Sequence, residues 1–419
     1  MTVLIAGAGI GGLSLALSLH QVGLDCIVFE SIDQIRPLGV GINILPHAAR
    51  ELSELDLEQD LSQTAIETAE LAYFSKHGKL IWSEPRGRLA GYNWPQFSVH
   101  RGALQMLLLK AVRQRLGSDA VRMGHHLVAW TETTDRVRAT FVDRASQQRR
   151  GVGEGDVLIA ADGIHSQARS TLYPDEGPPH WNGAILWRGV SLARPFLTGR
   201  TMAQIGHRRQ KFVTYPISTD TPDPDTAVIN WIAELKFEPD YQWRREDWNR
   251  PGRLNDFLPQ FQSWQYDWLD IPALITSAEQ IYEYPMVDRD PVSRWTHGRT
   301  TLLGDAAHPM YPIGSNGASQ AILDARVLTR AFQTHGVTSD ALKAYEAERR
   351  PATAKIVTAN RATGPDEVLD LVEQRAPDGF DDIEAVASRD ERAAIAEKYK
   401  ALAGFDKDSL NARPSIVAP

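Results

Sequence analysis

The run Gly7-Ala8-Gly9-Ile10-Gly11-Gly12 constrains the fold of this chain more than any other feature. It stands between residues 3–6, an apolar run typical of a buried strand, and residues 11–22, whose pattern predicts a helix. Glycines at these spacings allow a tight turn, the approach of a pyrophosphate to the backbone, and close packing of the helix on the strand. Residues 25–30 predict a second strand that ends at Glu30, where a carboxylate can accept hydrogen bonds from an adenosine ribose. The opening therefore predicts a parallel strand–helix–strand unit that binds a dinucleotide; the alternative is a tight turn without a ligand.

The composition of the 419 residues is that of a globular protein, with 42% hydrophobic and 23% charged residues. The formal net charge of −8 and the lack of a long basic run argue against a nucleic-acid partner. The apolar start is interrupted by glycines and is too short for a membrane span, so we expect no membrane association. The single cysteine, Cys26, cannot form an intramolecular disulfide or a cysteine-based metal site, so we expect a cytoplasmic protein without a bound metal.

A second motif lies in the later part of the chain, where residues 299–303 predict a strand that delivers Asp305 at its carboxyl end. The loop from Gly314 to Ala318 then leads into a predicted helix over 315–334. A helix start carries free N–H groups and about half a positive charge, which suits the negative pyrimidine edge of a reduced flavin. In this interpretation Asp305 holds a ribityl hydroxyl. The alternative is a buried aspartate that caps the helix, with His308 satisfied in the core.

Three separated signatures thus stand in the chain: the glycine run with its acid, the run Asp162-Gly163-Ile164-His165-Ser166 with Arg169, and the segment from Gly304 to Ala325. Together they resemble the class A flavoprotein aromatic hydroxylases, which have the fold of para-hydroxybenzoate hydroxylase, over roughly residues 1–360. The resemblance implies an FAD-dependent aromatic monooxygenase with NADH or NADPH as co-substrate. It implies that O₂ reacts with the reduced cofactor and that a C4a-hydroperoxyflavin passes one oxygen atom to an electron-rich aromatic or heteroaromatic ring.

The resemblance also implies which residues contact FAD. Arg101, at a predicted helix start, would lie beside the pyrophosphate, and the backbone at Leu127 would lie near the adenine. The Asp162 signature would support both FAD and the pyridine nucleotide, the alternative being an ordinary strand-to-helix connection. Residues 39–42 would lie beside the isoalloxazine, where small residues let the ring move between positions. The cofactor-binding candidates are Gly7, Gly9, Gly12, Glu30, Arg36, Gly41, Arg101, Leu127, Asp162, Asp305, Gly314, Ser315, Asn316, Gly317 and Ala318.

We therefore expect an α/β fold in which a Rossmann-like FAD-binding domain is interrupted by an antiparallel-sheet substrate domain and followed by C-terminal helices. Seven of the eleven tryptophans lie between 181 and 268, among strand-like runs that alternate as in a sheet with one buried face. In the first domain, residues 46–63 and 102–116 predict helices. The expected boundaries are 1–75, 97–180 and 276–335 for the FAD-binding domain, 76–96 and 181–275 for the substrate-binding sheet domain, and 336–419 for the C-terminal helical segment.

Four further runs, at 36–43, 82–87, 187–190 and 284–291, resemble hydroxylases that act on phenazine carboxylates. A phenazine-carboxylate-like substrate is therefore expected, with or without loss of the ring carboxylate. Salicylate-, hydroxybenzoate- and quinolone-type substrates stay open, as do an NAD-linked dehydrogenase, a flavoprotein that only binds aromatic molecules, and a homodimer.

No general base stands out in the sequence. The predicted antiparallel sheet would cover the substrate with its aromatic side chains, although such side chains are as often plain core. The pocket candidates are Arg188, Tyr215, Trp231, His308, Tyr311 and Pro312.

Overall fold

A six-stranded sheet forms around the opening strand of the chain. The structure is a computed structural model that describes residues 1–238, 240–242, 250–362 and 364–418. The strands of this sheet are β1 (Thr2–Ala6), β2 (Asp25–Phe29), β8 (Val121–Arg122), β12 (Val157–Ala160), β20 (Thr296–His297) and β21 (Thr300–Leu302). Their order is β20-β21-β12-β1-β2-β8, and all neighbours except β20 and β21 are parallel.

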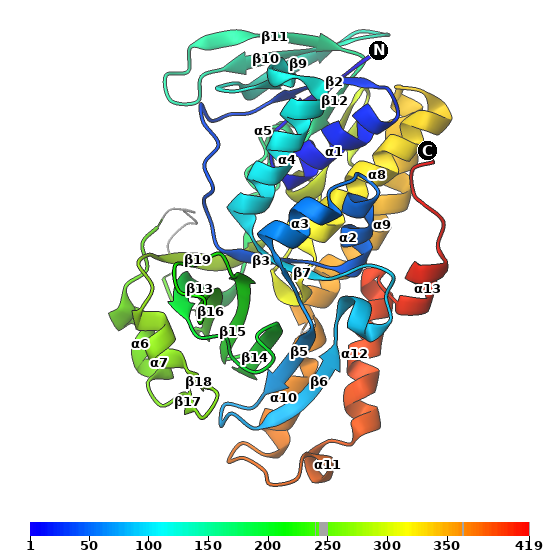
Figure 1. Cartoon of the computed structure of the whole chain (residues 1–419). Helices are drawn as coiled ribbons and strands as arrows, with labels where there is room; N and C mark the ends of the chain where they lie inside the picture. Colours follow the sequence, from blue (N-terminus) through cyan, green and yellow to red (C-terminus); the bar gives the residue numbers. More distant parts are fainter. Residues whose placement is uncertain (239, 243–249, 363, 419) are drawn as a thin grey trace.

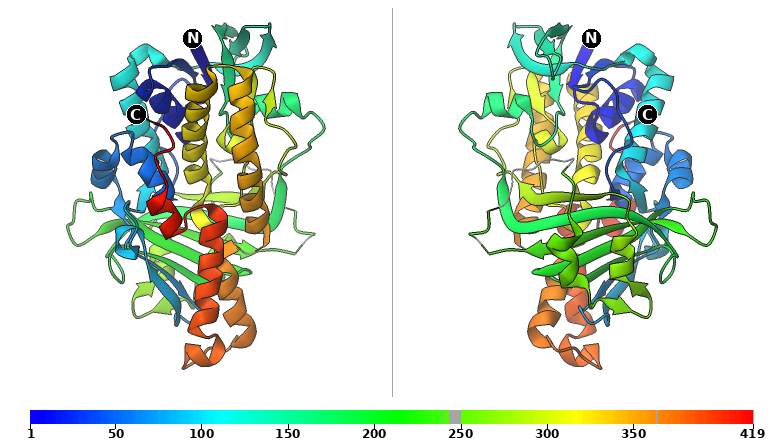
Figure 2. Two further views of the ribbon diagram at one scale, coloured as in Figure 1. Left: turned by 90° about the vertical axis from the view of Figure 1, so that its right-hand side faces the viewer. Right: turned by 90° about the vertical axis from the view of Figure 1, so that its left-hand side faces the viewer.

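Long helices pack around this sheet. They are α1 (Ile10–Gln21), α4 (Arg101–Leu116), α8 (Gly317–His335) and α9 (Ser339–Ala362). α1 follows the glycine run and packs against both α4 and α8, so most of its residues are buried. α8 packs against α9, and Figure 2 shows these two long helices side by side. The predicted strand–helix–strand unit is therefore present, with its helix inside the core.

A second sheet of seven strands lies below the first in the view of Figure 1. Its strands are β5 (Glu70–Phe74), β6 (Leu80–Pro85), β13 (His180–Ala193), β14 (Thr201–His207), β15 (Gln210–Ser218), β16 (Ala227–Lys236) and β19 (Ile281–Asp288). The order is β19-β13-β16-β15-β14-β5-β6, and only β14 and β5 pair in parallel.

The seven-stranded sheet buries both of its faces, because successive side chains of a strand point to opposite sides. On one face, Trp187 and Trp231 pack with Phe257 of helix α6 (Leu254–Phe261) in an aromatic core that also takes α7 (Ile271–Thr276). On the other face, Tyr215 and Asn230 approach the FAD-binding half of the molecule at Gly41. The second face is therefore the one that borders the candidate site.

Shorter elements complete the fold. Two three-stranded sheets and one hairpin contain β3 (Gly41–Ile44), β4 (Ile66–Glu67) and β7 (Phe97–His100); β9 (His126–Glu132), β10 (Val137–Val142) and β11 (Arg149–Gly155); and β17 (Gln265–Tyr266) and β18 (Leu269–Asp270). The shorter helices are α2 (Pro46–Ser53), α3 (Glu58–Thr64), α5 (Gln167–Leu172), α10 (Glu367–Arg375), α11 (Ile383–Val386), α12 (Arg389–Ala403) and α13 (Lys407–Ala412).

The C-terminal helices pack back onto the rest of the molecule. Buried residues of α10 join the apolar cluster on the second face of the seven-stranded sheet. α12 is bound to β6, because Arg392 donates to the carbonyl oxygen of Ile81 at 2.6 Å and Lys400 pairs with Glu84 at 2.8 Å. In Figure 1, α12 accordingly runs beside β6.

The expected fold class is confirmed, with two local differences. Residues 46–63 form two helices instead of one, because the chain turns at Asp56, whose φ is +57°. The seven-stranded sheet also takes in β5 and β19, which lie in ranges that we expected to belong to the FAD-binding domain. Among the described residues, no helix is both long and apolar enough to cross a membrane.

Candidate active site

The carboxyl ends of four parallel strands meet at one edge of the six-stranded sheet. β1 leads into Gly7, β2 into Glu30, β12 into the segment with Asp162, and β21 into the turn with Asp305. Open α/β sheets bind their ligands outside this edge. The fold therefore brings the three sequence signatures together, although they lie hundreds of residues apart.

The glycines of the first turn divide into two kinds by the space around them. A Cβ at Gly12 would lie 2.0 Å from the carbonyl oxygen of Gly7, and a Cβ at Gly7 would lie 2.3 Å from the carbonyl oxygen of Ala161. These two positions are closed by the backbone itself. A Cβ at Gly9 would meet nothing within 4 Å. The open space lies at the glycine whose backbone was expected to approach a pyrophosphate.

Glu30 is tied to the glycine turn by its carboxylate. One oxygen accepts from the backbone N–H of Ala8 at 2.8 Å, and the other accepts from the hydroxyl of Ser31 and the N–H of Ile32. A carboxylate has room for about four hydrogen bonds, so a ribose hydroxyl can still be accepted. The predicted adenine neighbour Leu127 is buried on β9, close to where His125 donates its N–H to the carbonyl oxygen of Glu30.

Two aspartates at the sheet edge keep acceptor oxygens free. Asp162 caps α5 with Oδ2, which accepts from Gln167 and Ala168, while its buried Oδ1 has no partner among the described residues. The carboxylate of Asp305 is exposed to the edge and accepts no hydrogen bond from the described residues. Burial raises the pKa of the Asp162 carboxyl above the ordinary value for aspartate. Donors on a ligand such as ribityl hydroxyls would satisfy these oxygens.

The helix start predicted near residue 315 begins at Gly317, where a Cβ would again meet nothing within 4 Å. Before it, Gly314 and Ser315 both have positive φ angles, of 69° and 57°. Asn316 is inaccessible, and its side-chain amide donates to the carbonyl oxygen of Gly314 at 3.1 Å. The groups available to a ligand at this helix start are therefore the backbone N–H groups of Gly317 and Ala318. The side chain of Asn316 is turned away from it.

The loop before β3 reaches the start of α4, where Arg101 is exposed and donates its backbone N–H to the carbonyl oxygen of Val40 at 2.9 Å. A Cβ at Gly102 would lie 2.4 Å from the backbone of Pro37, so the loop is packed directly on the helix. Arg36 in this loop is exposed. The charge of Arg101 acts to lower the pKa of Asp305.

These features fit FAD. Open space stands at Gly9 and Gly317, and Asp162 and Asp305 have acceptor oxygens without partners among the described residues. Arg101, at the start of α4, is an exposed cation. A pyrophosphate needs free N–H groups and a cation, and a ribityl chain needs acceptors for its hydroxyls. The three sequence signatures therefore lie at one edge of the sheet, and their residues suit a flavin dinucleotide.

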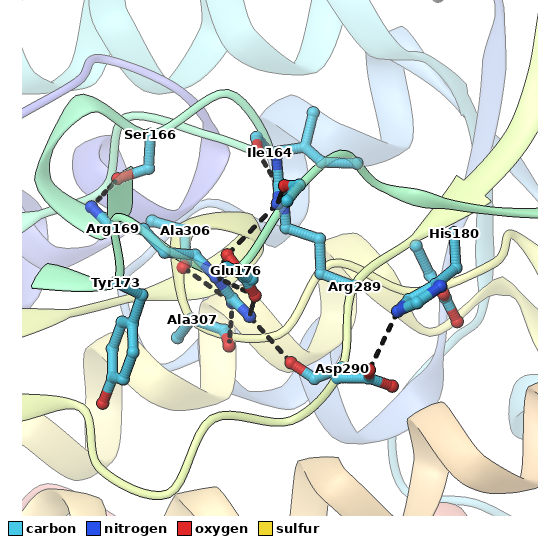
Figure 3. A network of polar contacts seen from close by, with 12 residues as sticks. Ile164, Ser166, Arg169, Tyr173, Glu176, His180, Arg289, Asp290, Ala306 and Ala307 are labelled. Atoms are coloured by element: carbon cyan, nitrogen blue, oxygen red, sulfur yellow. Dashed lines mark hydrogen bonds and ion pairs between the residues drawn. The ribbon is translucent and has the colours of Figure 1, made fainter. Parts of the chain in front are cut away.

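Arg169 fastens two of the signatures to each other, as Figure 3 shows. Its inaccessible guanidinium donates to the carbonyl oxygens of Ala306 and Ala307, at 3.1 and 2.8 Å, directly after Asp305. It also forms a bidentate pair with Glu176, with Nε 2.9 Å from Oε2. Arg169 thus holds the turn after β21 against α5, and it does so from inside the protein.

A second arginine extends this network toward the seven-stranded sheet. Arg289 pairs with the same carboxylate of Glu176 at 3.1 Å and donates to the carbonyl oxygen of Ile164. In Figure 3 the network continues through Asp290 to His180, the first residue of β13, at 2.8 Å. The signature around Asp162 is therefore connected to both sheets.

His308 lies in the core and away from the open edge. Its Nε2 is 2.5 Å from Oδ2 of Asp324, whose other oxygen pairs with Arg349 at 2.7 Å. Burial acts to raise the pKa of Asp324, but the charges of His308 and Arg349 outweigh it and lower the pKa to about 2. His308 thus links the turn after β21 with α8 and α9. This agrees with the alternative that His308 is a core residue with its hydrogen bond satisfied.

Arg188 and Tyr215 form the wall of the seven-stranded sheet that faces the FAD-binding half. Nη2 of Arg188 donates to the carbonyl oxygen of Gly41 at 2.9 Å, and the guanidinium acts to lower the pKa of Tyr215 against the larger effect of burial. Asn230, which we did not expect from the sequence, accepts from the N–H of Gly41 at 2.7 Å. A Cβ at Gly41 would lie 2.7 Å from Asn230 and 2.8 Å from Tyr215, so the two halves of the molecule meet there without a gap.

Trp231 does not belong to this wall, and the expectation that it covers the substrate is corrected. It is inaccessible on the opposite face of the sheet, where its indole N–H donates to Ser191 at 3.0 Å. The reason is the alternation along β16, which turns Asn230 toward Gly41 and therefore turns its neighbour Trp231 away. In the sequence, the only sign of this orientation was the polar Asn230 directly before Trp231 in a largely apolar strand.

The other two pocket candidates lie in the segment after His308. Pro312 is exposed, whereas Tyr311 is buried among Leu186, Tyr284 and Met286 on the second face of the sheet. Burial raises the pKa of Tyr311. Pro312 therefore remains available to a ligand. Tyr311 instead attaches the segment after His308 to the seven-stranded sheet.

A pocket of about 420 Å³ opens beyond Tyr311, between the end of the seven-stranded sheet and the C-terminal helices. Its charged side chains neutralise each other, since Lys211 lies 2.6 Å from Asp366 and 3.1 Å from Glu234. Arg361 likewise pairs with Asp288 at 2.7 Å. We read these ion pairs as the contacts that attach α9 and α10 to the sheet.

Comparison with known proteins agrees with this site. The family model described as FAD binding domain matches residues 1–236 and 265–360. Phenazine 1,6-dicarboxylic acid hydroxylase PhzS of Lysobacter antibioticus is 45% identical over 361 residues, which cover 86% of this chain and 89% of that protein. The 3-amino-4-hydroxybenzoate 2-monooxygenase PtmB3 of Streptomyces platensis is 31% identical, with 86% and 87% covered. A solved salicylate hydroxylase substrate complex has a TM-score of 0.74 at 22% identity, with 100% and 98% covered.

The chain belongs to the FAD-binding domain family. Within that family its class is that of the FAD-dependent aromatic monooxygenases, which use NADH or NADPH as co-substrate. The predictions of an FAD cofactor and of this enzyme class are thereby confirmed.

Proposed function

We propose that the chain hydroxylates an aromatic carboxylate, and that its substrate is of the phenazine-carboxylate type. The observation that carries the proposal is the environment of Arg188. The guanidinium forms no ion pair with an acidic side chain among the described residues, and its buried Nε has no hydrogen-bond partner. A half-buried cation without a counter-ion is costly, so a site that keeps one is suited to an anionic ligand.

Neighbouring residues support the same substrate class. Burial raises the pKa of Tyr215 to about 12, so the phenol is protonated at neutral pH. A protonated phenol can donate its hydrogen to a substrate oxygen or ring nitrogen. The names of PhzS and PtmB3 both describe enzymes that act on aromatic carboxylic acids. The identity of 45% favours a phenazine ring over a single benzene ring.

In this proposal the protein positions the reactants and excludes water. FAD supplies the redox chemistry when it is bound: it takes a hydride from NADH or NADPH and activates O₂. Gly9, Asp162 and Asp305 would hold its chain, and the N–H groups at the start of α8 would favour negative charge on its pyrimidine edge. Arg188 and Tyr215 orient the aromatic acid, while the packed junction at Gly41 keeps water from the space between the two halves.

The test is a panel of paired compounds with the FAD-loaded protein. Phenazine carboxylates, hydroxybenzoates and quinolones are each offered as the acid and as the neutral carboxamide. We expect a phenazine acid to stimulate NAD(P)H oxidation and to give a product heavier by one oxygen atom, with or without loss of CO₂. Arg188→Gln should raise KM for the acid by about tenfold or more, since a charge-assisted hydrogen bond contributes about 1.5–3 kcal/mol.

In the same variant, KM for the carboxamide should rise much less than KM for the acid. Arg138→Gln, at an exposed position of β10, should leave both KM values unchanged. Equal losses for acid and carboxamide would contradict the role of Arg188. Binding of the acids without oxygenated product would instead favour a flavoprotein that only binds aromatic molecules. An oxygenated product from hydroxybenzoates or quinolones alone would contradict the phenazine proposal and would assign that other class as the substrate.

We also propose a cytoplasmic location and a homodimer. Cys26, the only cysteine, is free and buried, as suits a reducing compartment. Fractionation of the producing cells and the mass of the purified holoenzyme by light scattering test these two points; a periplasmic or secreted protein, or a monomer at micromolar concentration, would contradict them.

A further inference from the structure

The C-terminal helix α12 reaches the loop that precedes the flavin-facing helix start. Tyr399 of α12 is only 6% exposed, and its hydroxyl lies among three polar groups. It accepts from the side-chain N–H of Asn316 at 2.8 Å and can donate to Oδ1 of Asn360 at 2.9 Å or to the carbonyl oxygen of Ile313 at 3.3 Å. One hydroxyl thus joins α12, the end of α9 and the loop before α8.

The loop is shaped around this hydroxyl. A Cβ at Gly314 would lie 2.0 Å from Oη of Tyr399, so the glycine is required there by the tyrosine. The side-chain amide of Asn316 is used completely: its nitrogen donates to Tyr399 and Gly314, and its oxygen accepts from Gln320 at 3.2 Å. No polar atom of Asn316 is left for a cofactor, although the residue directly precedes the open N–H groups of Gly317 and Ala318.

The orientation of those N–H groups therefore depends on a residue far along the chain. A helix start stabilises an anion only when its free N–H groups point at the charge, and the effect falls off within the first turn. Tyr399 lies outside the segments that match the family model, which end at residue 360. Its influence on the site is consequently a property of the C-terminal segment and not of the matched domain.

We propose that Tyr399 is a positioning residue for the flavin: through Asn316 and Gly314 it fixes the start of α8, and the C-terminal helix thereby sets how strongly the reduced cofactor is stabilised. The inference rests on the proposed placement of the flavin at this helix start. Removal of the hydroxyl leaves one donor on Asn316 and one acceptor on Asn360 buried without a partner. The loop then relaxes, and the N–H groups lose their alignment with the negative edge of the reduced flavin.

The experiment compares Tyr399→Phe with Tyr92→Phe. Tyr92 lies in the same apolar cluster, and its hydroxyl donates to the carbonyl oxygen of Phe405 at 2.7 Å, just after the end of α12 and without a contact to Asn316 or Gly314 among the described residues. For each holoenzyme we measure the dissociation constant of FAD and the two-electron reduction potential of the bound flavin. In Tyr399→Phe, reduced FAD should lose about tenfold more affinity than oxidised FAD, which is a shift of about 30 mV to a more negative potential.

Tyr92→Phe should keep the potential of the unaltered enzyme even if its thermal stability falls. A potential that is unchanged in Tyr399→Phe, or displaced equally in both variants, would overturn the inference. A double-mutant cycle gives a second check: in an Asn316→Ala background, Tyr399→Phe should add little further shift, because the two residues act through one bond. If the unaltered chain bound no FAD, the proposed function itself would fail, and that outcome is distinct from a normal holoenzyme in which Tyr399 has no effect.

Discussion

At the scale of single residues, the site is built from positions that look alike in sequence and have different roles. Gly12 is closed by the carbonyl oxygen of Gly7, whereas Gly9 faces open space. Both belong to the same glycine run, and the sequence motif treats them as one signature. The structure separates a glycine that allows the helix to pack from a glycine that leaves room for a ligand.

Alanine substitutions at the two positions should therefore fail in different ways. Gly12→Ala should destabilise the apoprotein by about 1–3 kcal/mol or more, because the added methyl group overpacks a backbone contact. Gly9→Ala should leave the apoprotein as stable as before and weaken FAD binding by about tenfold, or about 1.4 kcal/mol. Urea unfolding of the apoprotein and fluorescence titration with FAD measure the two effects. Loss of apoprotein stability in Gly9→Ala would contradict the assignment of open space to that residue.

At the scale of elements, α8 is held in place by charges at its centre as well as by its start. Asp324 of α8 pairs with both His308 and Arg349 in a buried network. This network joins α8 to α9 and to the turn after β21. These pairings hold the pKa of Asp324 at about 2, compared with an ordinary value of 3.8. A carboxyl whose pKa is lowered by folding contributes stability above its unfolded pKa and loses it as the pH falls.

The stability of the protein should accordingly fall between about pH 4 and pH 2, by about 2 kcal/mol from this group. Asp324→Asn should be less stable at neutral pH and should show a flatter dependence in that range, measured by urea unfolding at a series of pH values. Asp340→Asn, which removes an exposed partner of Lys343 on α9, is the matched control and should leave the curve unchanged. An identical acid dependence in Asp324→Asn and the unaltered chain would show that the network does not act in this way.

At the scale of the whole molecule, three parts meet around one site: the six-stranded sheet with its helices, the seven-stranded sheet, and the C-terminal helices. Gly41 joins the first two through Asn230 and Arg188. Lys211 joins the second to the third, because it is 5% exposed between Glu234 of β16 and Asp366 before α10. Burial raises the pKa of Glu234, and the Lys211 charge opposes that rise.

Lys211→Met should leave two buried carboxylates facing each other and destabilise the protein at neutral pH by about 3–5 kcal/mol. The difference from the unaltered chain should shrink as the pH is lowered, because a carboxyl with a raised pKa destabilises the fold less when it is protonated. Thermal unfolding at several pH values measures this difference. Lys110→Met, at an exposed position of α4, is the control. A stability difference that does not change with pH would contradict the explanation.

The sequence by itself determined the parts of the site that depend on local spacing. The glycine run, Glu30 and Asp305 each follow a strand directly, and residues at the carboxyl ends of parallel strands meet wherever the strands pair. The fold class and the FAD cofactor were predictable for that reason. The individual cofactor-binding residues remain predictions, which the substitutions described above can test.

Only the tertiary structure decided which side chains form the second wall and what holds the flavin loop. Alternation along β16 required Asn230 and Trp231 to face opposite ways, but the packing of α6 and α7 chose the face of the tryptophan. Asn316 finds its partner Tyr399 at a separation of 83 residues, in a helix whose own pattern carries no sign of the flavin loop. Local patterns specify elements and turns, whereas contacts between distant elements depend on how those elements pack, and a single sequence does not record that packing.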